Sequence, residues 1–431
     1  MRGRVACSFR TAARGTRPYR QTIMKIMFTV QGDGRGHMTQ AIAAAQAFER
    51  HGHEIVAVTV GTNPSRTIPE FFAREFGDRL IPVASPGFSF QKARGVATLA
   101  TLREAVAGRG CYRRSLGAIG AAIERTEPDL IVNFLEPLMG VHNLLRRHPT
   151  PVVSVGHQFM LGHPEFVQCA KFAFQQWTMR QYVRLTGARS TKLALSFYPA
   201  AAIPERRLFV CPPLLRAEVF ELPHSQPGRF LLAYVLNQGY ADDILRWHAA
   251  FPDVELHCFC EKPKVEPVWR YDATLFFHKL DGTKFLRMMA ESRGVACTAG
   301  FESLNEAAWF GKPLLVVPVE NHIEQHLNAL DAQKAGLAMA ATSFDLTPLL
   351  RRWKGADLES HRSWLRQAGA RLLSIIERVA HKPVRTFVPA SAPAPAMAPQ
   401  FVPSLLESHF AGKSRGKSEL EASSREAVGH C

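Results

Sequence analysis

The stretch TAGFESLNEAAWFGKPLLVVP, Thr298 to Pro318, carries the clearest fold signal in this sequence of 431 residues. A short apolar run, GVACT, leads into Gly300, a helical segment follows from Glu302 to Phe310, and a second apolar run, PLLVVP, comes at once. Apolar strands that alternate with helices predict a parallel sheet with helices on both faces. In such sheets ligands bind beyond the carboxyl ends of the strands. The stretch therefore predicts an α/β fold with a ligand site at the glycine turn.

The same alternation occupies most of the chain and occurs twice. It begins at Met24, and it restarts after a proline-rich segment without periodicity. This pattern predicts two Rossmann-like, doubly wound domains that face a cleft, with residues 24–212 in the first domain, 213–228 in a linker and 229–381 in the second. Strands are expected at the apolar runs over residues 25–30, 54–60, 79–84, 129–134, 151–156, 192–197, 207–213, 229–236, 254–260, 274–280, 294–300 and 313–319. Helices are expected over residues 38–50, 70–76, 98–125, 139–146, 165–185, 283–292, 302–310, 322–335 and 358–380.

The two ends of the chain differ from the body in composition. Residues 1–23 hold six arginines and no acid, and they lack the apolar core of a secretory signal. They are expected to be a disordered or mispredicted extension, with an organelle-targeting peptide as the alternative. Residues 382–431 are rich in proline, alanine and serine at first and then polar, which predicts a disordered tail.

Net charge and cysteine usage limit the possible partners and the compartment. The formal charge is +16, of which the two ends contribute half. The remaining bias suits anionic ligands or an anionic membrane surface, and without a nucleic-acid-binding motif we expect no nucleic acid partner. The eight cysteines show no metal-site or disulfide spacing, and no apolar run is long enough to span a bilayer. We therefore expect a cytoplasmic protein, with the inner face of the cytoplasmic membrane as an alternative.

The glycine turn has the residues of a phosphate site. Gly300 allows close approach of a ligand to the backbone, and the amides of Phe301, Glu302 and Ser303 with the Ser303 hydroxyl are donors suited to a diphosphate. Glu306 lies one turn further on the same helical face, where a carboxylate can accept from two ribose hydroxyls. The alternative is that serine and glutamate merely cap the helix.

A polar cluster, ENHIEQHLNA, follows the next strand at Glu320 to Ala329. His322, Glu324 and Gln325 have the hydrogen-bonding groups that sugar hydroxyls require. We expect Glu324 and Gln325 to point into the same cleft as the glycine turn. These three residues are the candidates for binding a donor sugar.

A glycine-rich loop, FTVQGDGRGHMTQ, follows the first strand. Its glycines are Gly32, Gly34 and Gly36, so it does not have the G-x-G-x-x-G spacing of dinucleotide-binding folds. The second strand, EIVAVTVGTN, also ends without the acid that would hold an adenosine ribose. Both features disfavour a dinucleotide-dependent oxidoreductase.

The block from Gly300 to Ala329 resembles the donor-site signature of GT-B glycosyltransferases, including the peptidoglycan N-acetylglucosaminyltransferase and the UDP-glycosyltransferases. The loop before His37 resembles the glycine-rich G-H loop of the same families. More narrowly, the G-x-G-x-G-H start, NFLEPL with Glu136 and SVGHQFML with His157 resemble a poorly characterised group of bacterial and archaeal glycosyltransferases. That group has an aspartate before its F-E-P, where this chain has Asn133 and an inserted leucine.

The resemblance implies a hexosyl- or N-acetylhexosaminyltransferase that uses a UDP-sugar as its donor substrate, with inversion. No D-x-D metal motif occurs, so we expect neither a metal ion nor another cofactor. His37 is the first candidate for the base that takes the acceptor proton. Its alternative roles are to cap the loop or to bind phosphate, and Glu136 and Asp33 are the alternative catalytic carboxylates. His157 is expected beside Gly32, Gly34 and Gly36 on the acceptor and phosphate side, unless it is structural.

The sequence leaves the acceptor open. The expected helix over residues 165–185 carries Phe166, Ala170, Phe174 and Trp177 on one face, with basic residues elsewhere. Such a helix either packs in the core or lies on an anionic membrane, where it could receive a lipid-linked acceptor. Two rival functions also remain: a non-hydrolysing UDP-sugar 2-epimerase, and a non-catalytic nucleotide-sugar- or anion-binding protein.

Overall fold

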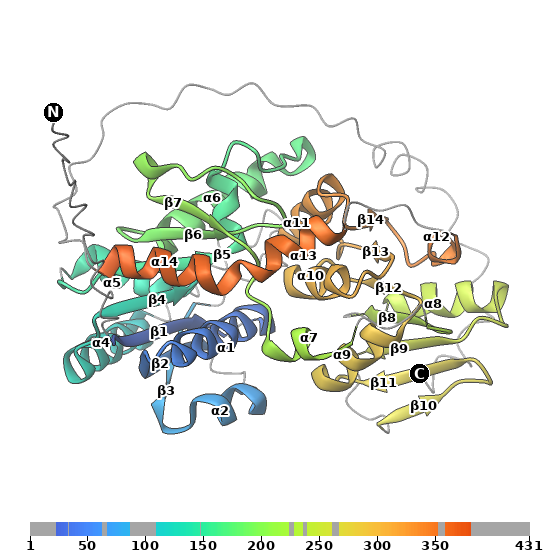
Figure 1. The fold of residues 1–431 in the computed structure, drawn as a ribbon, viewed down its shortest axis with the longest axis horizontal. Helices are drawn as coiled ribbons and strands as arrows, with labels where there is room; N and C mark the ends of the chain where they lie inside the picture. Colours follow the sequence, from blue (N-terminus) through green and yellow to red (C-terminus); the bar gives the residue numbers. More distant parts are fainter. Residues whose placement is uncertain are drawn as a thin grey trace, which may run out of the picture.

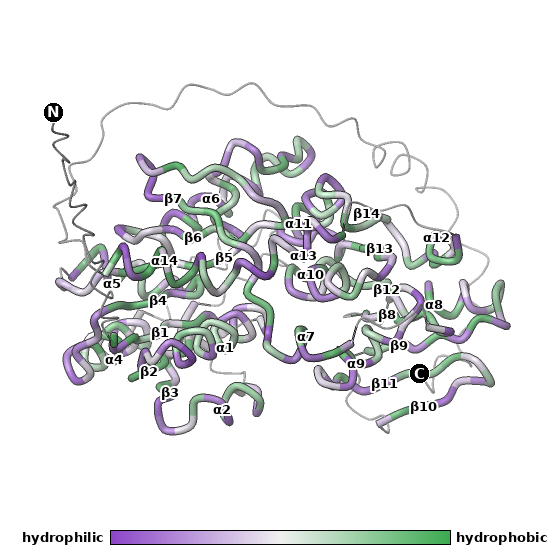
Figure 2. Tube along the Cα trace, viewed as in Figure 1, coloured by the Kyte–Doolittle hydropathy of each residue, from purple (hydrophilic) through white to green (hydrophobic). Residues whose placement is uncertain are grey.

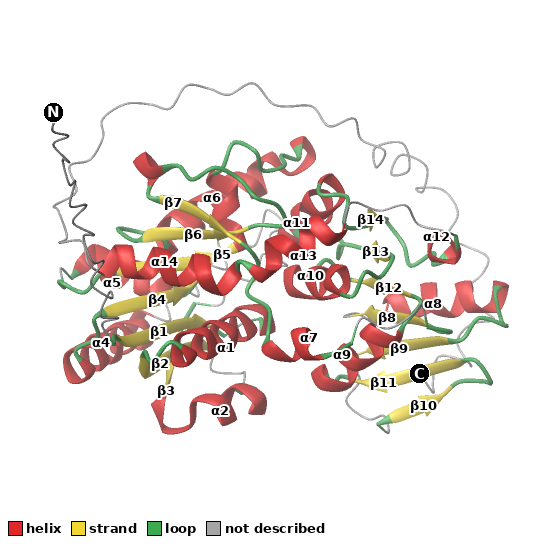
Figure 3. Ribbon diagram, viewed as in Figure 1, coloured by secondary structure: helices red, strands yellow, loops and turns green. Residues whose placement is uncertain are grey.

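The computed structural model describes residues 23–32, 34–62, 67–86, 109–146, 148–223, 228–235, 239–260, 267–351 and 358–380. Within these residues the chain forms two seven-stranded sheets with helices packed on them (Figures 1 and 3). The predicted tail and nearly all of the predicted N-terminal extension lie outside the described residues. We use N-lobe for the part built on the first sheet and C-lobe for the part built on the second.

The first sheet has the strand order β3-β2-β1-β4-β5-β6-β7, and its strands pair in parallel. The order reverses at β1, which is the position where doubly wound sheets bind ligands. The strands predicted from the apolar runs are confirmed: β1 Lys25–Gln31, β2 Glu54–Thr62, β3 Leu80–Ala84, β4 Leu130–Phe134, β5 Val152–Gly156, β6 Thr191–Leu195 and β7 Leu208–Cys211. The main helices of this lobe are α1 Arg35–Arg50, α2 Glu70–Phe76, α4 Arg109–Thr126, α5 Pro137–Leu145 and α6 Ala173–Thr186.

The second sheet has the strand order β10-β11-β9-β8-β12-β13-β14, in which β10 alone runs antiparallel. Its strands are β8 Leu231–Val235, β9 Leu256–Cys260, β10 Val268–Arg270, β11 Leu275–Lys279, β12 Gly294–Cys297, β13 Leu314–Val316 and β14 Met339–Ala340. Its helices are α7 Ala217–Glu221, α8 Gly239–Ala250, α9 Gly282–Glu291, α10 Phe301–Trp309, α11 Ile323–Lys334, α12 Thr347–Leu350, α13 Leu358–Arg366 and α14 Ala368–Ala380.

Most predicted helices agree with the structure to within three residues at each described end, and two differ by more. The helix expected over 165–185 begins only with a 3₁₀ turn at Ala170–Phe172, after which α6 runs to Thr186. The helix expected over 358–380 is two helices, α13 and α14, that meet at Gln367. The first part of the helix expected over 98–125 lies outside the described residues.

The last helix, α14, returns to the N-lobe and packs across the first sheet (Figure 1). At its start the Cys211 thiol at the end of β7 contacts the carbonyl oxygen of Ala368 at 3.7 Å. Near its end the Arg378 guanidinium lies over the ring of Phe209. Leu372 and Ile376 are fully buried on the face between these contacts. The chain after the C-lobe therefore joins the two lobes.

Hydrophobic segments run along the strands, and hydrophobic and hydrophilic residues alternate along the outer helices (Figure 2). In the N-lobe, the ring of Phe28 on β1 makes edge-to-face contacts with Phe48, Phe76 and Phe134. Such fully buried rings at the centre of a sheet contribute most of its packing energy. They hold β1 in place at the centre of the first sheet.

Candidate active site

Two helices begin without a side-chain cap at the junction of the lobes. Helix α1 follows β1 with Gly34 as its N-cap, and α10 follows β12 with Gly300 as its N-cap. A methyl group added at Gly300 would meet nothing within 4 Å, so there is open space beside the first turn of α10. Ser303 is partly exposed on the same turn. N–H groups that no N-cap side chain occupies, next to open space, are suited to an anion. On α10 the Glu302 carboxylate accepts from its own amide.

The three glycines of the first loop have different surroundings. Gly32 packs on β2: its N–H donates to the Gly61 carbonyl at 2.7 Å, and an added Cβ would lie 2.7 Å from the same oxygen. Gly34 has open space around it. Gly36 faces the other lobe, where an added Cβ would lie 2.5 Å from a carboxylate oxygen of Glu302. Asp33 lies outside the described residues, so its predicted role stays a prediction.

His37 lies at the junction and is linked to α10 through Gln40. Its Nδ1 lies 3.4 Å from Oε1 of Gln40, and the Gln40 amide nitrogen donates to Oε1 of Glu302. Burial lowers the pKa of His37 from its ordinary value, although the charge of Glu324 and the bond to Gln40 oppose this. Burial also raises the pKa of the Glu302 carboxyl to about 7. Two titratable groups with shifted pKa values therefore lie on the two sides of one buried amide.

Glu306, the predicted ribose ligand, is buried and ion-paired. Its Oε1 accepts from Nε of Arg216 at 2.8 Å, and the same guanidinium donates to the Gly282 carbonyl. The Glu306 side chain is 4% exposed, whereas that of Arg216 is 22% exposed. Arg216 belongs to the segment that was predicted only as a linker, so the sequence did not identify it as part of the site.

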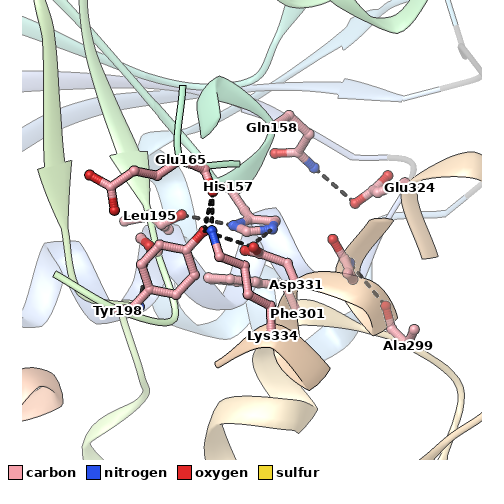
Figure 4. A network of polar contacts seen from close by, with 12 residues as sticks. His157, Gln158, Glu165, Leu195, Tyr198, Ala299, Phe301, Glu324, Asp331 and Lys334 are labelled. Carbon is pink, nitrogen blue, oxygen red and sulfur yellow. Dashed lines mark hydrogen bonds and ion pairs between the residues drawn. The ribbon is translucent and has the colours of Figure 1, made fainter. Parts of the chain in front are cut away.

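The three residues predicted to bind the donor sugar diverge in the structure. Glu324 is partly exposed and accepts from the Gln158 amide of the N-lobe at 2.9 Å (Figure 4). Gln325 is turned to the loop before α11, where its Oε1 accepts from the Val319 amide at 2.9 Å. His322 caps α11 by accepting from the Gln325 amide. Only Glu324 therefore points to the other lobe.

His157 is buried rather than placed in an open loop. Its Nδ1 donates to the Leu195 carbonyl at 2.8 Å, and its ring stacks on Phe301 with centroids 4.1 Å apart. Burial lowers the pKa of His157 to about 4. This placement agrees with a structural role for His157, the alternative named above. Because Phe301 is the first residue of α10, the stacked rings also hold the start of that helix against the N-lobe.

A polar network beside His157 also joins the two lobes (Figure 4). Asp331 on α11 accepts from the Tyr198 hydroxyl at 2.8 Å, and Oδ2 of Asp331 lies 3.9 Å from Nε2 of His157. Lys334, one turn further, donates to the Glu165 carbonyl. Asp331 is fully buried, and burial raises the pKa of its carboxyl to about 7.

Glu136 is fully buried at the start of α5. Its Oε1 accepts from the Ser85 hydroxyl at 2.6 Å and from the Leu138 amide at 3.0 Å, which makes it the N-cap of that helix. Asn133, the departure from the family pattern, accepts from the Glu136 amide at 2.8 Å. In this position Glu136 stabilises the start of α5, and its catalytic role stays a prediction.

No group of three or more His, Cys, Asp or Glu side chains suited to a metal ion occurs among the described residues. No described helix is long and apolar enough to cross a membrane.

Comparison with known proteins supports the GT-B architecture. Residues 24–350 match the model of glycosyl transferase family 1. The glycotransferase of kitacinnamycin is 16% identical over 83% of this chain and 99% of its own, with a TM-score of 0.56. The calicheamicin glycosyltransferase CalG4 is 17% identical over 84% of this chain and 99% of its own, with a TM-score of 0.53. UGT2 of Phytolacca americana, solved with UDP-2fluoro-glucose and pterostilbene, is 13% identical over 83% of this chain and 100% of its own, with a TM-score of 0.56.

Identities this low establish the fold alone. No curated protein matches the chain in sequence. The predicted fold, two Rossmann-like units of the GT-B type, is confirmed by these neighbours and by the two parallel sheets.

Proposed function

Because the chain belongs to glycosyl transferase family 1, we propose that it moves a hexosyl or N-acetylhexosaminyl group from a UDP-sugar to an acceptor hydroxyl. We further propose that the reaction inverts the anomeric carbon and needs no metal ion. Glycosyl transfer itself follows from the family, whereas the donor, the stereochemistry and the metal independence are the proposal.

One observation carries this proposal: the uncapped start of α10, with Glu306 one turn further, lies at the same junction as His37. The α10 N-terminus supplies amides and a partial positive charge for a diphosphate. Glu306 supplies acceptor atoms for ribose hydroxyls, while its present partner Arg216 can donate to the oxygens of the same hydroxyls. Glu324 is the remaining candidate for the sugar hydroxyls.

In the proposed reaction the acceptor oxygen attacks the anomeric carbon while the bond from that carbon to the diphosphate oxygen breaks. The acceptor proton passes to His37, and UDP leaves with the bonding electron pair. The lowered pKa of His37 keeps its ring neutral near pH 7, as a base requires. The dipole of α10 stabilises the charge that develops on the leaving diphosphate, which is the part a metal ion takes in other transferases.

We propose a lipid-linked acceptor at an anionic membrane, on the basis of the surface of α6. Phe174 and Trp177 stack on each other in solvent, 64% and 56% exposed, instead of packing in the core. Lys171 and Arg184 are exposed beside them, and residues 166–190 contain no acid. Exposed aromatic rings next to basic residues suit the interface of an anionic bilayer.

Calorimetry with UDP tests the nucleotide site. We expect Glu306→Ala to weaken UDP binding at least tenfold, because hydrogen bonds to a charged group each contribute about 1.5–3 kcal/mol. Glu291→Ala, an exposed acid of the same lobe, is the matched control and should bind UDP like the native protein. Equal UDP affinity of the native protein and the Glu306 variant would place the nucleotide elsewhere.

A further inference from the structure

A short chain of hydrogen bonds connects the proposed base to the donor helix of the other lobe. It runs from Nδ1 of His37 to Oε1 of Gln40, and from Nε2 of Gln40 to Oε1 of Glu302. Gln40 is 3% exposed, so water does not compete for its amide. Glu302 is held against α1 at Gly36, where any larger residue would collide with its carboxylate.

The chemistry of each partner determines where the protons lie. An ionised carboxylate only accepts, so the Gln40 NH₂ group faces Glu302 and its carbonyl oxygen faces His37. A carbonyl oxygen has no proton to give, so His37 must donate from Nδ1. The neutral ring then carries its lone pair on Nε2.

From this geometry we propose that Gln40 and Glu302 are positioning residues that hold His37 in the Nδ1–H tautomer and so leave Nε2 as the atom that accepts the acceptor proton. The inference rests on the proposed role of His37. It assigns the orienting task to a glutamine three positions further on the same helix and to an acid of the opposite lobe.

The same chain predicts an inactive arrangement. When Glu302 is protonated, it donates, and the Gln40 amide turns so that its NH₂ group faces His37. Nδ1 of His37 then becomes an acceptor, the ring proton moves to Nε2, and the base is lost. Each step conserves one proton on the ring, so no further reactant is needed.

Burial places this change near neutral pH. Burial is the largest cause that raises the pKa of Glu302 to about 7; the bond from Gln40 lowers this pKa, and the charges of Glu306 on α10 and Glu324 on α11 make smaller contributions that raise it. Glu324 also faces His37, and Arg216 from the linker is paired with Glu306. The active tautomer is therefore expected above the pKa of Glu302 and is lost as the pH falls through it.

Nitrogen-15 NMR of the histidine rings in the full-length protein tests the assignment without any substrate, because the two neutral tautomers differ in their ring nitrogen shifts. His37 is identified by the signal that is missing in His37→Ala. At about pH 8.5 we expect the Nδ1–H tautomer, with a shift to Nε2–H near pH 7 in the native protein. In Gln40→Leu this preference is lost, and in Glu302→Gln the change near pH 7 is absent because no proton can be taken up.

The matched control is Thr39→Val, which removes a side-chain bond to the Arg35 carbonyl on the same turn and should leave the His37 spectrum unchanged. An Nε2–H ring in the native protein at about pH 8.5, or a native tautomer in Gln40→Leu, overturns the proposal. UDP calorimetry on the same samples separates the two proposals. Absence of UDP binding by the native protein refutes the donor assignment. The NMR spectra decide the tautomer of His37 independently of that result.

Discussion

Asp331 predicts a pH dependence of stability that can be calculated from the structure. Its carboxyl is fully buried between the lobes, and burial raises its pKa from 3.8 to about 7. At about 1.4 kcal/mol per pKa unit, keeping this group ionised in the folded state costs about 4 kcal/mol. Because the pKa is raised on folding, the stabilising contribution is complete below about pH 4 and is lost as the pH rises through about 7.

The perturbation is Asp331→Asn. Asparagine keeps an acceptor for the Tyr198 hydroxyl, cannot ionise, and adds an N–H that can face Nε2 of His157. We expect the variant to be more stable than the native protein by about 2–4 kcal/mol at about pH 8, and the difference to disappear below about pH 4. Urea unfolding followed by far-UV circular dichroism at several pH values measures this difference.

The neighbouring His157 changes the stability with pH in the opposite direction, and this provides a check. Burial lowers the pKa of His157 to about 4, so its contribution is present above about pH 6.5 and is lost as the pH falls. The loss of stability at low pH, which comes from His157, should therefore remain in Asp331→Asn. The loss of stability at high pH, which comes from Asp331, should be absent. Asp253→Asn, at an exposed acid of the C-lobe, should unfold like the native protein at every pH. A pH-independent difference, or an Asp331 variant that is less stable at about pH 8, would refute the reasoning.

Three further predictions concern the lobe junction and the surface. Arg216→Met should lower the free energy of unfolding by about 2–4 kcal/mol because it leaves the Glu306 carboxylate buried and unpaired, and most of this loss should vanish in a Glu306→Gln background, measured by urea unfolding. Gly36→Ala should change stability by less than about 1 kcal/mol, since gained helix propensity offsets crowding, yet it should displace Glu302 and weaken the Nδ1–H tautomer of His37 in the NMR spectrum. Trp177→Ser should reduce binding to vesicles of anionic lipid roughly tenfold in a sedimentation assay, whereas Phe71→Ser, at another exposed ring of the N-lobe, should not.

The strands could be predicted where burial on both faces makes a run continuously apolar. LIVNF and VVSVG, the segments of β4 and β5, are buried at every position, and both were recognised as strands. The strands β10 and β14 were missed because runs of three and two residues, Val268–Arg270 and Met339–Ala340, show no period. The amphipathic pattern of α14 indicates a buried face, but it does not indicate that this face lies on the N-lobe.

The sequence predicted the part of the candidate site whose residues are neighbours in the chain, and it missed the partners that are distant. The donor-helix residues are close in the sequence, so one motif identifies Gly300 to Glu306. Their partners are distant: Gln40 is 262 positions from Glu302, Gln158 is 166 from Glu324, and Arg216 is 90 from Glu306. A single sequence does not pair positions this far apart. Gln40 and His37 are only three positions apart, but the helix was predicted to begin at Met38, so their shared face on α1 was not recognised.

These partners resolve an electrostatic difficulty in the proposed donor site. The C-lobe places the carboxylates of Glu302, Glu306 and Glu324 near the helix that should receive an anionic diphosphate, and like charges there oppose binding. Each acid is offset by a group that the C-lobe sheet does not supply: Arg216 pairs with Glu306, Gln158 donates to Glu324, and Gln40 donates to Glu302. The amides at the start of α10 can then act on the ligand. If UDP binds as proposed, its affinity depends on both lobes, and we expect variants of N-lobe residues with no nucleotide contact of their own to alter it.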